Sequence, residues 1–228
     1  MIRNPMQSPD ESLSPAYFDL ARQQMVEYQL RRRGIGDERV LSAMASVPRE
    51  RFVPPDLWHA AYDDGALPIG WDQTISQPLV VAYMAEALQL RPGDKLLEIG
   101  TGSGYGAAVL SLLAREVHTV ERLAPLADRA KDALERLVYE NVHVHLSDGT
   151  VGLRAEAPFD AICVTAGARE IPQPLLDQLA EGGRLVIPVG PLHNQRMQRI
   201  TRRGDDFLHE DLGAFAFVPL IGEHGWPE

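Results

Sequence analysis

The sequence predicts an α/β protein with a doubly wound, Rossmann-like sheet, a helical annex before the sheet and antiparallel strands after it. Two observations carry this prediction. Short apolar runs typical of buried strands alternate with helical segments, and a glycine-rich loop stands between the first such run and the helix after it. Strands that alternate with helices form a parallel sheet, because each crossover places a helix on a face of that sheet.

The overall composition argues against several classes of protein. The 228 residues fit one domain with a modest extension, and 45% hydrophobic with 24% charged residues is ordinary globular usage. A formal net charge of −10 argues against nucleic acid or an anionic membrane as a partner. A single cysteine, Cys163, allows no intrachain disulfide, and neither a membrane-length apolar run nor a signal peptide stands out. We therefore expect a cytoplasmic monomer.

The first third of the chain is predicted to be a mobile arm followed by the helical annex. Residues 1–16 are polar and contain several prolines, as is typical of a mobile arm. Apolar residues recur at helical spacing over residues 17–33, and Asp37 is suited to cap a second helix that the Val47-Pro48 step ends. Further prolines then mark an irregular stretch, so that residues 17–80 make up the annex with its loops.

Residues 81–228 are predicted to form the Rossmann-like core, which joins the annex in one domain over residues 17–228. A helix follows Pro78, and Gly182-Gly183 is expected to stop the last helix of the core. Further helices are expected at residues 105–114, 123–138 and 174–180. The expected parallel strands cover residues 95–99, 117–121, 142–146, 159–165 and 184–189. A closing antiparallel hairpin is expected from residues 196–202 and 214–220, with its turn at Gly204-Asp205.

The glycine loop indicates a nucleotide-like ligand. Gly100-Thr101-Gly102-Ser103-Gly104 lets the backbone amides at the start of a helix approach such a ligand closely. The dinucleotide pattern, however, would place its third glycine where Tyr105 stands. On the loop alone, a nicotinamide-dependent oxidoreductase and a simple tight turn both stay open.

Three carboxylates near the loop help to decide which ligand it binds. Glu98 precedes the loop, Glu121 ends the second predicted strand and Asp148 follows the third. Because the carboxyl ends of parallel strands meet at one edge of a sheet, these groups would surround a pyrophosphate with negative charge. They better suit a cation that offers ribose hydroxyls and an adenine amino group. The pattern therefore favours S-adenosylmethionine.

Segments along most of the chain carry a family resemblance. They are Val47-Pro48-Arg49-Glu50-Arg51-Phe52-Val53, Ala66-Leu67-Pro68-Ile69-Gly70, Gln73-Thr74-Ile75-Ser76-Gln77-Pro78, the loop segment 97–105, Val120-Glu121-Arg122, Phe159-Asp160-Ala161-Ile162, Glu181-Gly182-Gly183-Arg184-Leu185 and Phe217-Val218-Pro219-Leu220. In this order they resemble the protein-L-isoaspartate O-methyltransferases, from about Arg22 to the C-terminus. The segment Thr-Ile-Ser-Gln-Pro is the most specific, since methyltransferases in general lack it.

The resemblance implies an activity and a set of site residues. The activity is methyl transfer from S-adenosylmethionine to the free carboxylate of isoaspartyl residues in damaged proteins and peptides, which initiates their repair. Ser76 matches the family's active-site serine and is the implied catalytic residue. The implied substrate-binding residues are Gln73, Thr74, Ile75, Ser76, Val218 and Pro219. The implied cofactor-binding residues are Glu98, Gly100, Thr101, Gly102, Ser103, Gly104, Glu121, Arg122, Asp148 and Gly149.

Two departures from the family's pattern leave alternatives open. Asp72 replaces the second glycine of a Gly-x-Gly-Gln segment, and Ser147 replaces the first glycine of Gly-Asp-Gly. We expect a carboxylate at Asp72 to repel a carboxylate substrate unless it faces solvent or an arginine. A methyltransferase with another substrate, and a weakened member that mainly binds the cofactor, therefore stay open.

Two other kinds of site are disfavoured. A serine hydrolase would need a base within reach of Ser76, and none stands at nucleophile-elbow spacing. We expect no metal site, because His143 and His145 share one strand face without a third ligand.

Overall fold

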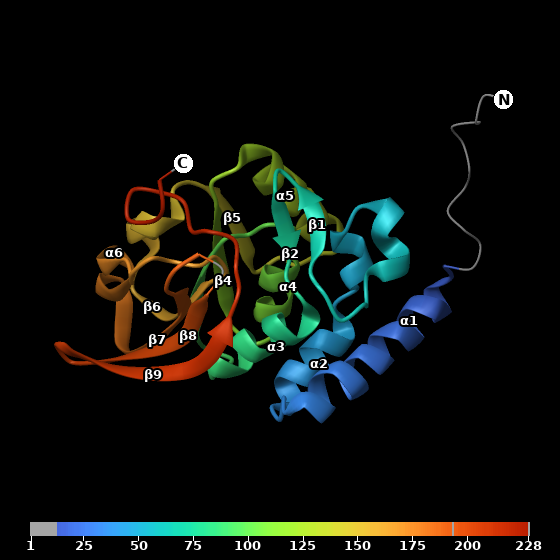
Figure 1. Ribbon diagram of the computed structural model, residues 1–228, viewed down its shortest axis with the longest axis horizontal. Helices are drawn as coiled ribbons and strands as arrows, with labels where there is room; N and C mark the ends of the chain where they lie inside the picture. Colours follow the sequence, from blue (N-terminus) through green and yellow to red (C-terminus); the bar gives the residue numbers. More distant parts are fainter. Residues whose placement is uncertain (1–12, 193, 228) are drawn as a thin grey trace.

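The computed structural model describes residues 13–192 and 194–227, and a seven-stranded sheet forms its centre (Figure 1). The strands are β3 (Lys95–Ile99), β4 (Glu116–Glu121), β5 (Val142–Leu146), β6 (Phe159–Val164), β7 (Leu179–Val189), β8 (Gln195–Arg203) and β9 (Asp206–Phe215). Their order is β5-β4-β3-β6-β7-β8-β9, with β3 to β7 parallel and the last two strands antiparallel. From the two central strands, β3 and β6, the strand order proceeds toward opposite edges of the sheet. The place between them, where the order reverses, is the topological switch point, and ligands bind there at the carboxyl ends of the strands.

Apolar clusters on the two faces of the sheet form the core. Successive residues of a strand point to opposite faces, so Leu96 belongs to one cluster and Leu97 to the other. The first cluster takes side chains from α1 to α5, and the second takes them from α6. The helices are α1 (Pro15–Gln24), α2 (Glu38–Ser46), α3 (Pro78–Ala87), α4 (Tyr105–Ser111), α5 (Ala124–Arg136) and α6 (Gln173–Asp177). The predicted α/β class, with its antiparallel C-terminal strands, is confirmed.

The two predicted helices of the annex are present. Helix α1 continues through a π-helical turn, Met25–Leu30, and a 3-10 turn, Arg31–Arg33. Asp37 caps α2 by accepting a hydrogen bond from the Arg39 amide at 2.8 Å. The predicted arm over residues 1–16 lies mostly outside the described residues, and its last two residues already belong to α1. The helix begins earlier than expected because Ser14 caps it and proline suits its first position.

The prediction of an irregular stretch after α2 is wrong in one important part. Residues 67–75 form a two-stranded antiparallel hairpin of β1 (Leu67–Gly70) and β2 (Gln73–Ile75). Short 3-10 turns, Arg49–Phe52 and Pro55–Ala60, precede it. Only Ile69 and Ile75 of the hairpin are buried, so the apolar alternation is too short to indicate strands. Figure 1 shows the hairpin standing beside α5.

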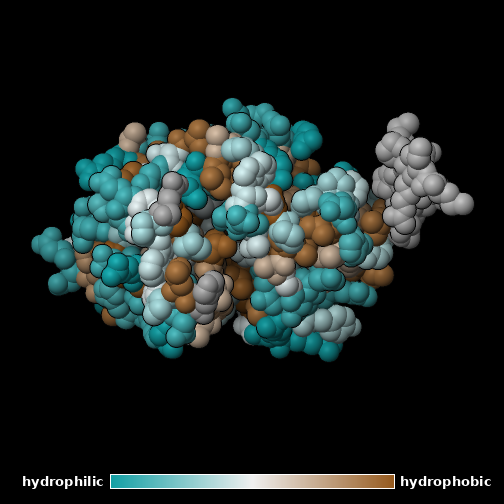
Figure 2. Space-filling model, turned by 45° about the horizontal axis from the view of Figure 1, so that its top comes forward, coloured by the Kyte–Doolittle hydropathy of each residue, from teal (hydrophilic) through white to brown (hydrophobic). Residues whose placement is uncertain are grey.

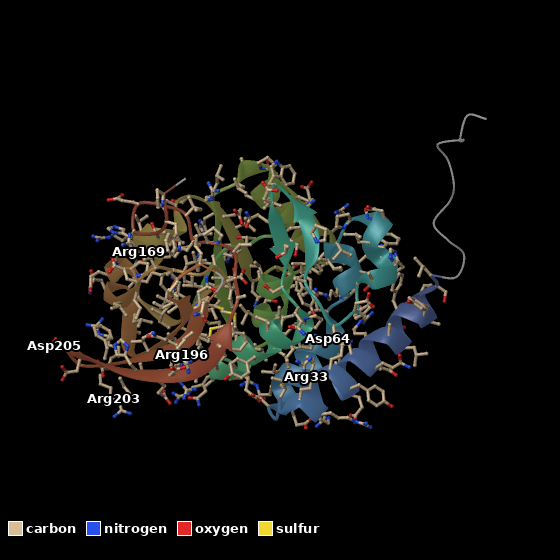
Figure 3. The ribbon with its side chains drawn as sticks, in the orientation of Figure 1. Arg33, Asp64, Arg169, Arg196, Arg203 and Asp205 are labelled. Carbon is tan, nitrogen blue, oxygen red and sulfur yellow. The ribbon has the colours of Figure 1, made fainter. Side chains whose placement is uncertain are left out.

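Two boundaries near the C-terminus also differ from expectation. The last helix ends at Asp177, and Gly182-Gly183 lie inside β7, which starts at Leu179 through an irregular register with β6. The final strand, expected at residues 214–220, is β9 at Asp206–Phe215. Residues 206–215 pair with β8 at the sheet edge, while residues 216–221 leave the sheet to line the site. The turn at Gly204-Asp205 is confirmed, and Asp205 marks the far end of this hairpin (Figure 3).

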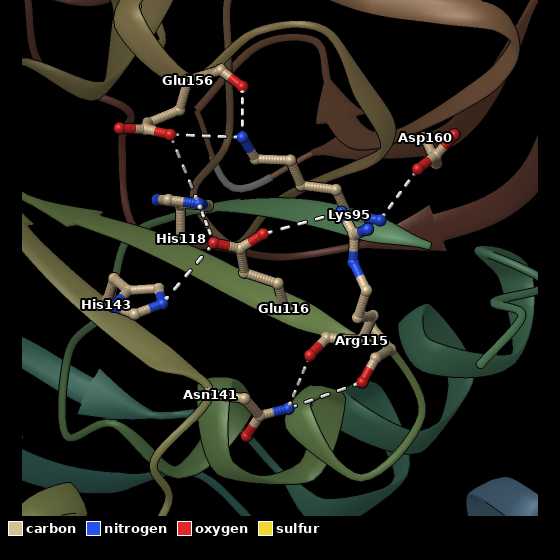
Figure 4. A network of polar contacts seen from close by, with 9 residues as sticks. Lys95, Arg115, Glu116, His118, Asn141, His143, Glu156 and Asp160 are labelled. Carbon is tan, nitrogen blue, oxygen red and sulfur yellow. Dashed lines mark hydrogen bonds and ion pairs between the residues drawn. The ribbon is translucent and has the colours of Figure 1, made fainter. Parts of the chain in front are cut away.

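A group of histidines lies on one face of β4 and β5, away from the strand ends that meet at the switch point (Figure 4). The buried His118 lies between His143 and His145, with ring centroids 5.1 and 5.3 Å away. Its Nε2 contacts a Glu116 oxygen at 3.1 Å, and its Nδ1 contacts His145 Nε2 at 3.1 Å. Within residues 13–192 and 194–227, no group of three or more histidine, cysteine, aspartate or glutamate side chains is arranged to hold a metal ion.

Candidate active site

The glycine loop follows β3 at the switch point of the sheet. Gly100, Gly102 and Gly104 all have positive φ angles, at 98°, 55° and 89°. A side chain on Gly100 would also collide with the Thr165 hydroxyl, which donates a hydrogen bond to the Gly100 carbonyl at 2.8 Å. The loop can therefore make its turn against the end of β6 only with glycine at this position.

Glu98 lies on β3 beneath this loop and is almost fully buried. Its Oε2 accepts a hydrogen bond from the Thr119 hydroxyl at 2.6 Å, while its Oε1 has no hydrogen-bond partner among the described residues. Burial raises the pKa of Glu98 to about 8; the Thr119 hydrogen bond opposes this shift and the charge of Glu121 adds to it. A cationic ligand beside Glu98 would remove the penalty of ionising it.

Glu121, at the end of β4, accepts hydrogen bonds from a backbone amide of the glycine loop and from two amides of the segment after β4. Its Oε2 accepts a hydrogen bond from the Gly102 amide at 2.9 Å, and its Oε1 accepts from the amides of Arg122 and Leu123 at 2.9 and 3.0 Å. A carboxylate has about four acceptor positions. With three of these positions used, Glu121 is fixed in place and has about one position left for a ribose hydroxyl.

The structure does not bring Asp148 to the same place. Its Oδ1 accepts hydrogen bonds from the Thr150 amide and hydroxyl, and its Oδ2 accepts from the Glu223 amide at 2.7 Å. These bonds hold the pKa of Asp148 below its usual value, against the effect of its partial burial. Asp148 lines a separate hollow with Arg122 and Trp226, so its predicted contact with the cofactor stays a prediction.

The β1–β2 hairpin leans over the glycine loop and is tied to α5. Arg129 of α5 donates a hydrogen bond to the Ile69 carbonyl at 2.6 Å, and its guanidinium lies 5.6 Å from the centre of the Trp71 ring. Strand β2 and the residue after it carry the predicted substrate segment, Gln73 to Ser76. The tie to α5 therefore holds this segment close to the cofactor loop.

A cavity that is partly open to solvent lies between the hairpin, α3 and the glycine loop. All the predicted site residues line it except Gly104, which faces α5, and Asp148. The space-filling view shows a hollow with apolar walls near the middle of the molecule (Figure 2).

A second cavity adjoins the first at Ser76. Both cavities are lined by Thr74, Ser76, Thr165, Val218 and Pro219. The second also takes apolar side chains from Val80 and Phe217. No described residue forms a hydrogen bond with the Ser76 hydroxyl. Ser76 thus stands between the cavity suited to a cofactor and an adjoining groove suited to a peptide.

Asp72 does not face either cavity. It lies with Trp71 in the two-residue turn of the hairpin, where both residues have positive φ angles, 50° for Trp71 and 56° for Asp72. Its side chain is exposed. Aspartate tolerates this left-handed conformation better than most residues, so it replaces a glycine here without entering the site.

The structure adds lining residues that sequence reasoning missed. Helix α3 contributes an apolar wall from Val81, Met84 and Ala85, and β6 contributes Cys163 and Thr165. Burial, with the charge of Glu98, raises the pKa of the Cys163 thiol well above its usual value, so the thiol stays protonated. The position of Thr165, directly after a strand at the switch point, was the signal that could have identified it. The wall from α3 had no such signal, because its residues are ordinary core types.

Comparison with known proteins supports a methyltransferase site. Residues 21–225 match the family model described as protein-L-isoaspartate(D-aspartate) O-methyltransferase. A protein-L-isoaspartate O-methyltransferase of Methanoculleus marisnigri is 55% identical, with 90% of this chain and 93% of that protein aligned. One of Syntrophotalea carbinolica is 53% identical, with 92% and 98% aligned.

Two solved structures share the fold. One, named protein-L-isoaspartate O-methyltransferase, superposes with a TM-score of 0.80 at 30% identity and covers 90% of this chain and 67% of that one. The other, a Plasmodium falciparum protein described by the same activity and solved with S-adenosyl-L-homocysteine, has a TM-score of 0.75 at 27% identity, covering 88% and 98%. None of the helices described in the structure has both the length and the apolar character of a membrane span. The chain belongs to the protein-L-isoaspartate(D-aspartate) O-methyltransferase family.

Proposed function

We propose that this chain transfers the methyl group of S-adenosylmethionine to the free carboxylate of isoaspartyl residues in damaged proteins and peptides, with Ser76 as the residue that orients the carboxylate. One observation carries the proposal: Ser76 borders both the cofactor cavity and the open groove, and no described residue bonds its hydroxyl. The family's name gives the reaction.

The residues around the first cavity fit S-adenosylmethionine. Its sulfonium carries an electrophilic methyl group and a positive charge, and its amino group is a second cation. Glu98 offers the unpartnered Oε1 for a cation, and Glu121 offers acceptor capacity for a ribose hydroxyl. Val81, Met84 and Ala85 of α3 give the cavity one apolar wall. A nicotinamide dinucleotide suits these residues poorly, because its negative pyrophosphate would lie near the Glu121 carboxylate and would oppose ionisation of Glu98.

The chain's own part in the reaction is to place the accepting carboxylate. A carboxyl group with a reference pKa of about 4 is ionised at neutral pH, so no general base is required. The Ser76 hydroxyl donates a hydrogen bond to one carboxylate oxygen and leaves the other free to attack in line. The backbone of β2 and the Val218-Pro219 segment border the groove for the rest of the peptide. Positioning of this kind contributes roughly 7–11 kcal/mol to lowering a barrier.

Two synthetic peptides that differ only in one isoaspartyl or normal aspartyl linkage test the proposal. With isotope-labelled S-adenosylmethionine, the isoaspartyl peptide should accept label and its twin should not. Equal labelling of both peptides would indicate another substrate. Tight cofactor binding without labelling would indicate a weakened member of the family.

Replacing Ser76 by alanine tests its role. We expect kcat/KM for the isoaspartyl peptide to fall by about 10- to 100-fold, the loss that follows removal of a hydrogen bond to a charged group. The affinity for S-adenosylhomocysteine, measured by calorimetry, should stay unchanged. Ser46→Ala, on the outer side of α2, is the matched control and should have full activity. An Ser76→Ala enzyme as active as the control would contradict the assigned role.

We further propose a monomeric, cytoplasmic enzyme whose annex and core form one domain over residues 17–228. The net charge of −10 and the buried state of the single cysteine are compatible with this. Light scattering after gel filtration should give the mass of one chain, 25.2 kDa. A mass of two chains at micromolar concentration would contradict the monomer.

A further inference from the structure

Arg49 is a fully buried arginine that lies between the substrate segment and the cofactor loop. Its Nη2 donates a hydrogen bond to the Ser76 carbonyl at 2.8 Å, and its Nε donates to the Ala61 carbonyl at 2.8 Å. Its guanidinium lies 4.8 Å from the centre of the Tyr105 ring. Tyr105 begins α4 directly after the glycine loop and lines the cofactor cavity. One side chain therefore contacts both halves of the site.

The charge of Arg49 is not neutralised by a neighbouring carboxylate. No ion pair joins it to any described residue, and its Nη1 is buried without a hydrogen-bond partner. The adjacent Glu50 accepts a hydrogen bond from Tyr62 instead, at 2.6 Å. Burying an unpaired guanidinium is unfavourable. Its two hydrogen bonds to carbonyls offset part of this penalty, and they are what the arginine adds here, since an apolar side chain would leave the Ala61 and Ser76 carbonyls without this donor.

We propose that Arg49 is a positioning residue that holds Ser76 in place beside the cofactor cavity. This proposal rests on the role of Ser76 given above. The backbone of Ser76 is fixed through its carbonyl, so its hydroxyl is free for the substrate. The next residue is fixed separately, because Gln77 donates to Asp64 at 2.6 Å and Asp64 pairs with Arg33 at 2.7 Å (Figure 3). Gln77 and Asp64 are surface groups, whereas Arg49 is buried and joins the Ser76 carbonyl to the interior.

The forked shape of the guanidinium is what the arrangement requires. A guanidinium reaches two carbonyls and an aromatic ring at once, whereas a lysine ammonium is a single point on a flexible stem. In Arg49→Lys, the charge stays but the bridge between the Ala61 and Ser76 carbonyls is lost. A displacement of about 1 Å at a reacting group lowers the rate by about 100-fold. We therefore expect kcat/KM for the isoaspartyl peptide to fall by about 10- to 100-fold, mainly through kcat.

The control is Arg184→Lys. Arg184 is also a buried arginine; it donates to the Leu88 carbonyl at 2.8 Å and pairs with Asp94, but it lines neither cavity. The experiment measures peptide methylation, S-adenosylhomocysteine affinity and thermal midpoint for the wild type, both lysine variants, Ser76→Ala and the double variant Arg49→Lys/Ser76→Ala. We expect Arg184→Lys to lower the midpoint without lowering kcat. We expect Arg49→Lys to lower kcat with cofactor affinity kept within about twofold.

The double variant separates positioning from general stability. If Arg49 acts through Ser76, the double variant is about as slow as Ser76→Ala alone. Losses that multiply in full, or an Arg49→Lys enzyme as fast as Arg184→Lys, overturn the proposal. Arg49→Gln, which keeps a donor without the charge, is the second variant; failure of both Arg49 variants to fold would show a purely structural residue and also overturn it. A wild type that does not methylate the isoaspartyl peptide overturns the proposed function itself, and this result is read from the wild type alone.

Discussion

At the scale of single residues, Glu98 shows how burial changes the chemistry of a carboxyl group. Its pKa of about 8 follows first from its burial. A carboxyl group with this pKa is mostly protonated at pH 7, and a cation beside it favours release of the proton. Binding of a cationic cofactor and ionisation of Glu98 are therefore linked.

This linkage predicts a pH-dependent cofactor affinity. We expect the Kd for S-adenosylmethionine to fall as the pH rises from 6.5 to 8.5, by at most about tenfold per unit, and to level off above pH 8. Calorimetry at constant ionic strength would measure it. Glu98→Gln is the control, because any titration of the cofactor's own amino group is common to both proteins. The same slope in both would show that Glu98 is not the group that titrates.

Asp72 is the residue at which the sequence raised a concern about repulsion of the substrate, unless its side chain faces solvent, which it does in the structure. Its left-handed backbone explains why the family commonly has glycine there, and its exposed side chain keeps its charge out of the site. We predict that Asp72→Gly changes kcat/KM for an isoaspartyl peptide by less than about twofold. Steady-state kinetics on both proteins would measure this. A tenfold gain would show that the aspartate repels the substrate after all.

At the scale of secondary structure, α5 ends in an unusual way. The Tyr139 amide donates to the Leu134 carbonyl and the Val138 amide donates to the Glu135 carbonyl, the pattern of a Schellman cap. The cap places Val138 at a φ of 62°, although glycine is the usual residue there. Its side chain is 69% exposed, so little packing offsets the strain.

We predict that Val138→Gly raises the free energy of unfolding by about 1 kcal/mol. The left-handed conformation is unfavourable by about 1–2 kcal/mol for a residue with a side chain, and the added freedom of the unfolded chain offsets part of the gain. Urea denaturation would measure it. Lys131→Gly, at an exposed interior position of the same helix, should lower the free energy by about 1 kcal/mol. A destabilised Val138→Gly protein would show that the valine makes a contact worth more than the strain.

Elements with a strong local pattern were predicted from the sequence, and those defined by tertiary pairing were not. Strands β3 and β5 match their predicted ranges because each is a continuous or alternating apolar run next to clear turn residues. The β1–β2 hairpin was missed because Pro68 and a polar turn interrupt it. The last strand was misplaced because β9 is an edge strand with no buried residue, and its mixed composition has no regular apolar alternation that would reveal its pairing with β8.

At the scale of the whole molecule, the site also contains residues that the sequence could predict and residues that it could not. The topology rule places ligands at the carboxyl ends of β3 and β6, so the glycine loop and Glu121 could be predicted. Arg49 could not, because its role depends on three segments that only the folded chain brings together. The position of His118 could not be predicted either, because it packs between two histidines of the neighbouring strand.

The histidine group predicts how stability depends on pH. Burial holds the pKa of His118 and His145 below 6.5, although the nearby carboxylates of Glu116 and Glu156 oppose this at His118. A lowered histidine pKa contributes stability that is fully present above pH 6.5 and is lost as the pH falls through the folded-state value. We therefore expect the urea midpoint to fall between pH 7 and pH 5. The positive charge of Lys95 also lowers the pKa of His118.

A variant isolates this effect from other titrating groups. Glu98 works in the opposite sense, because its raised pKa contributes stability that is lost as the pH rises toward 8. The difference between the wild type and His118→Phe, measured by urea denaturation at each pH, removes that background. The midpoint of His118→Phe should fall less than that of the wild type over this range. Parallel curves for the two proteins would contradict the assignment.

One cluster of buried side chains runs from Phe18 in the first helix to Phe217 close to the other end of the chain. Phe217 is the last residue of this cluster to be translated, so the cluster cannot close before every strand of the sheet has been made. The annex and the sheet therefore cannot complete this shared part of the core separately.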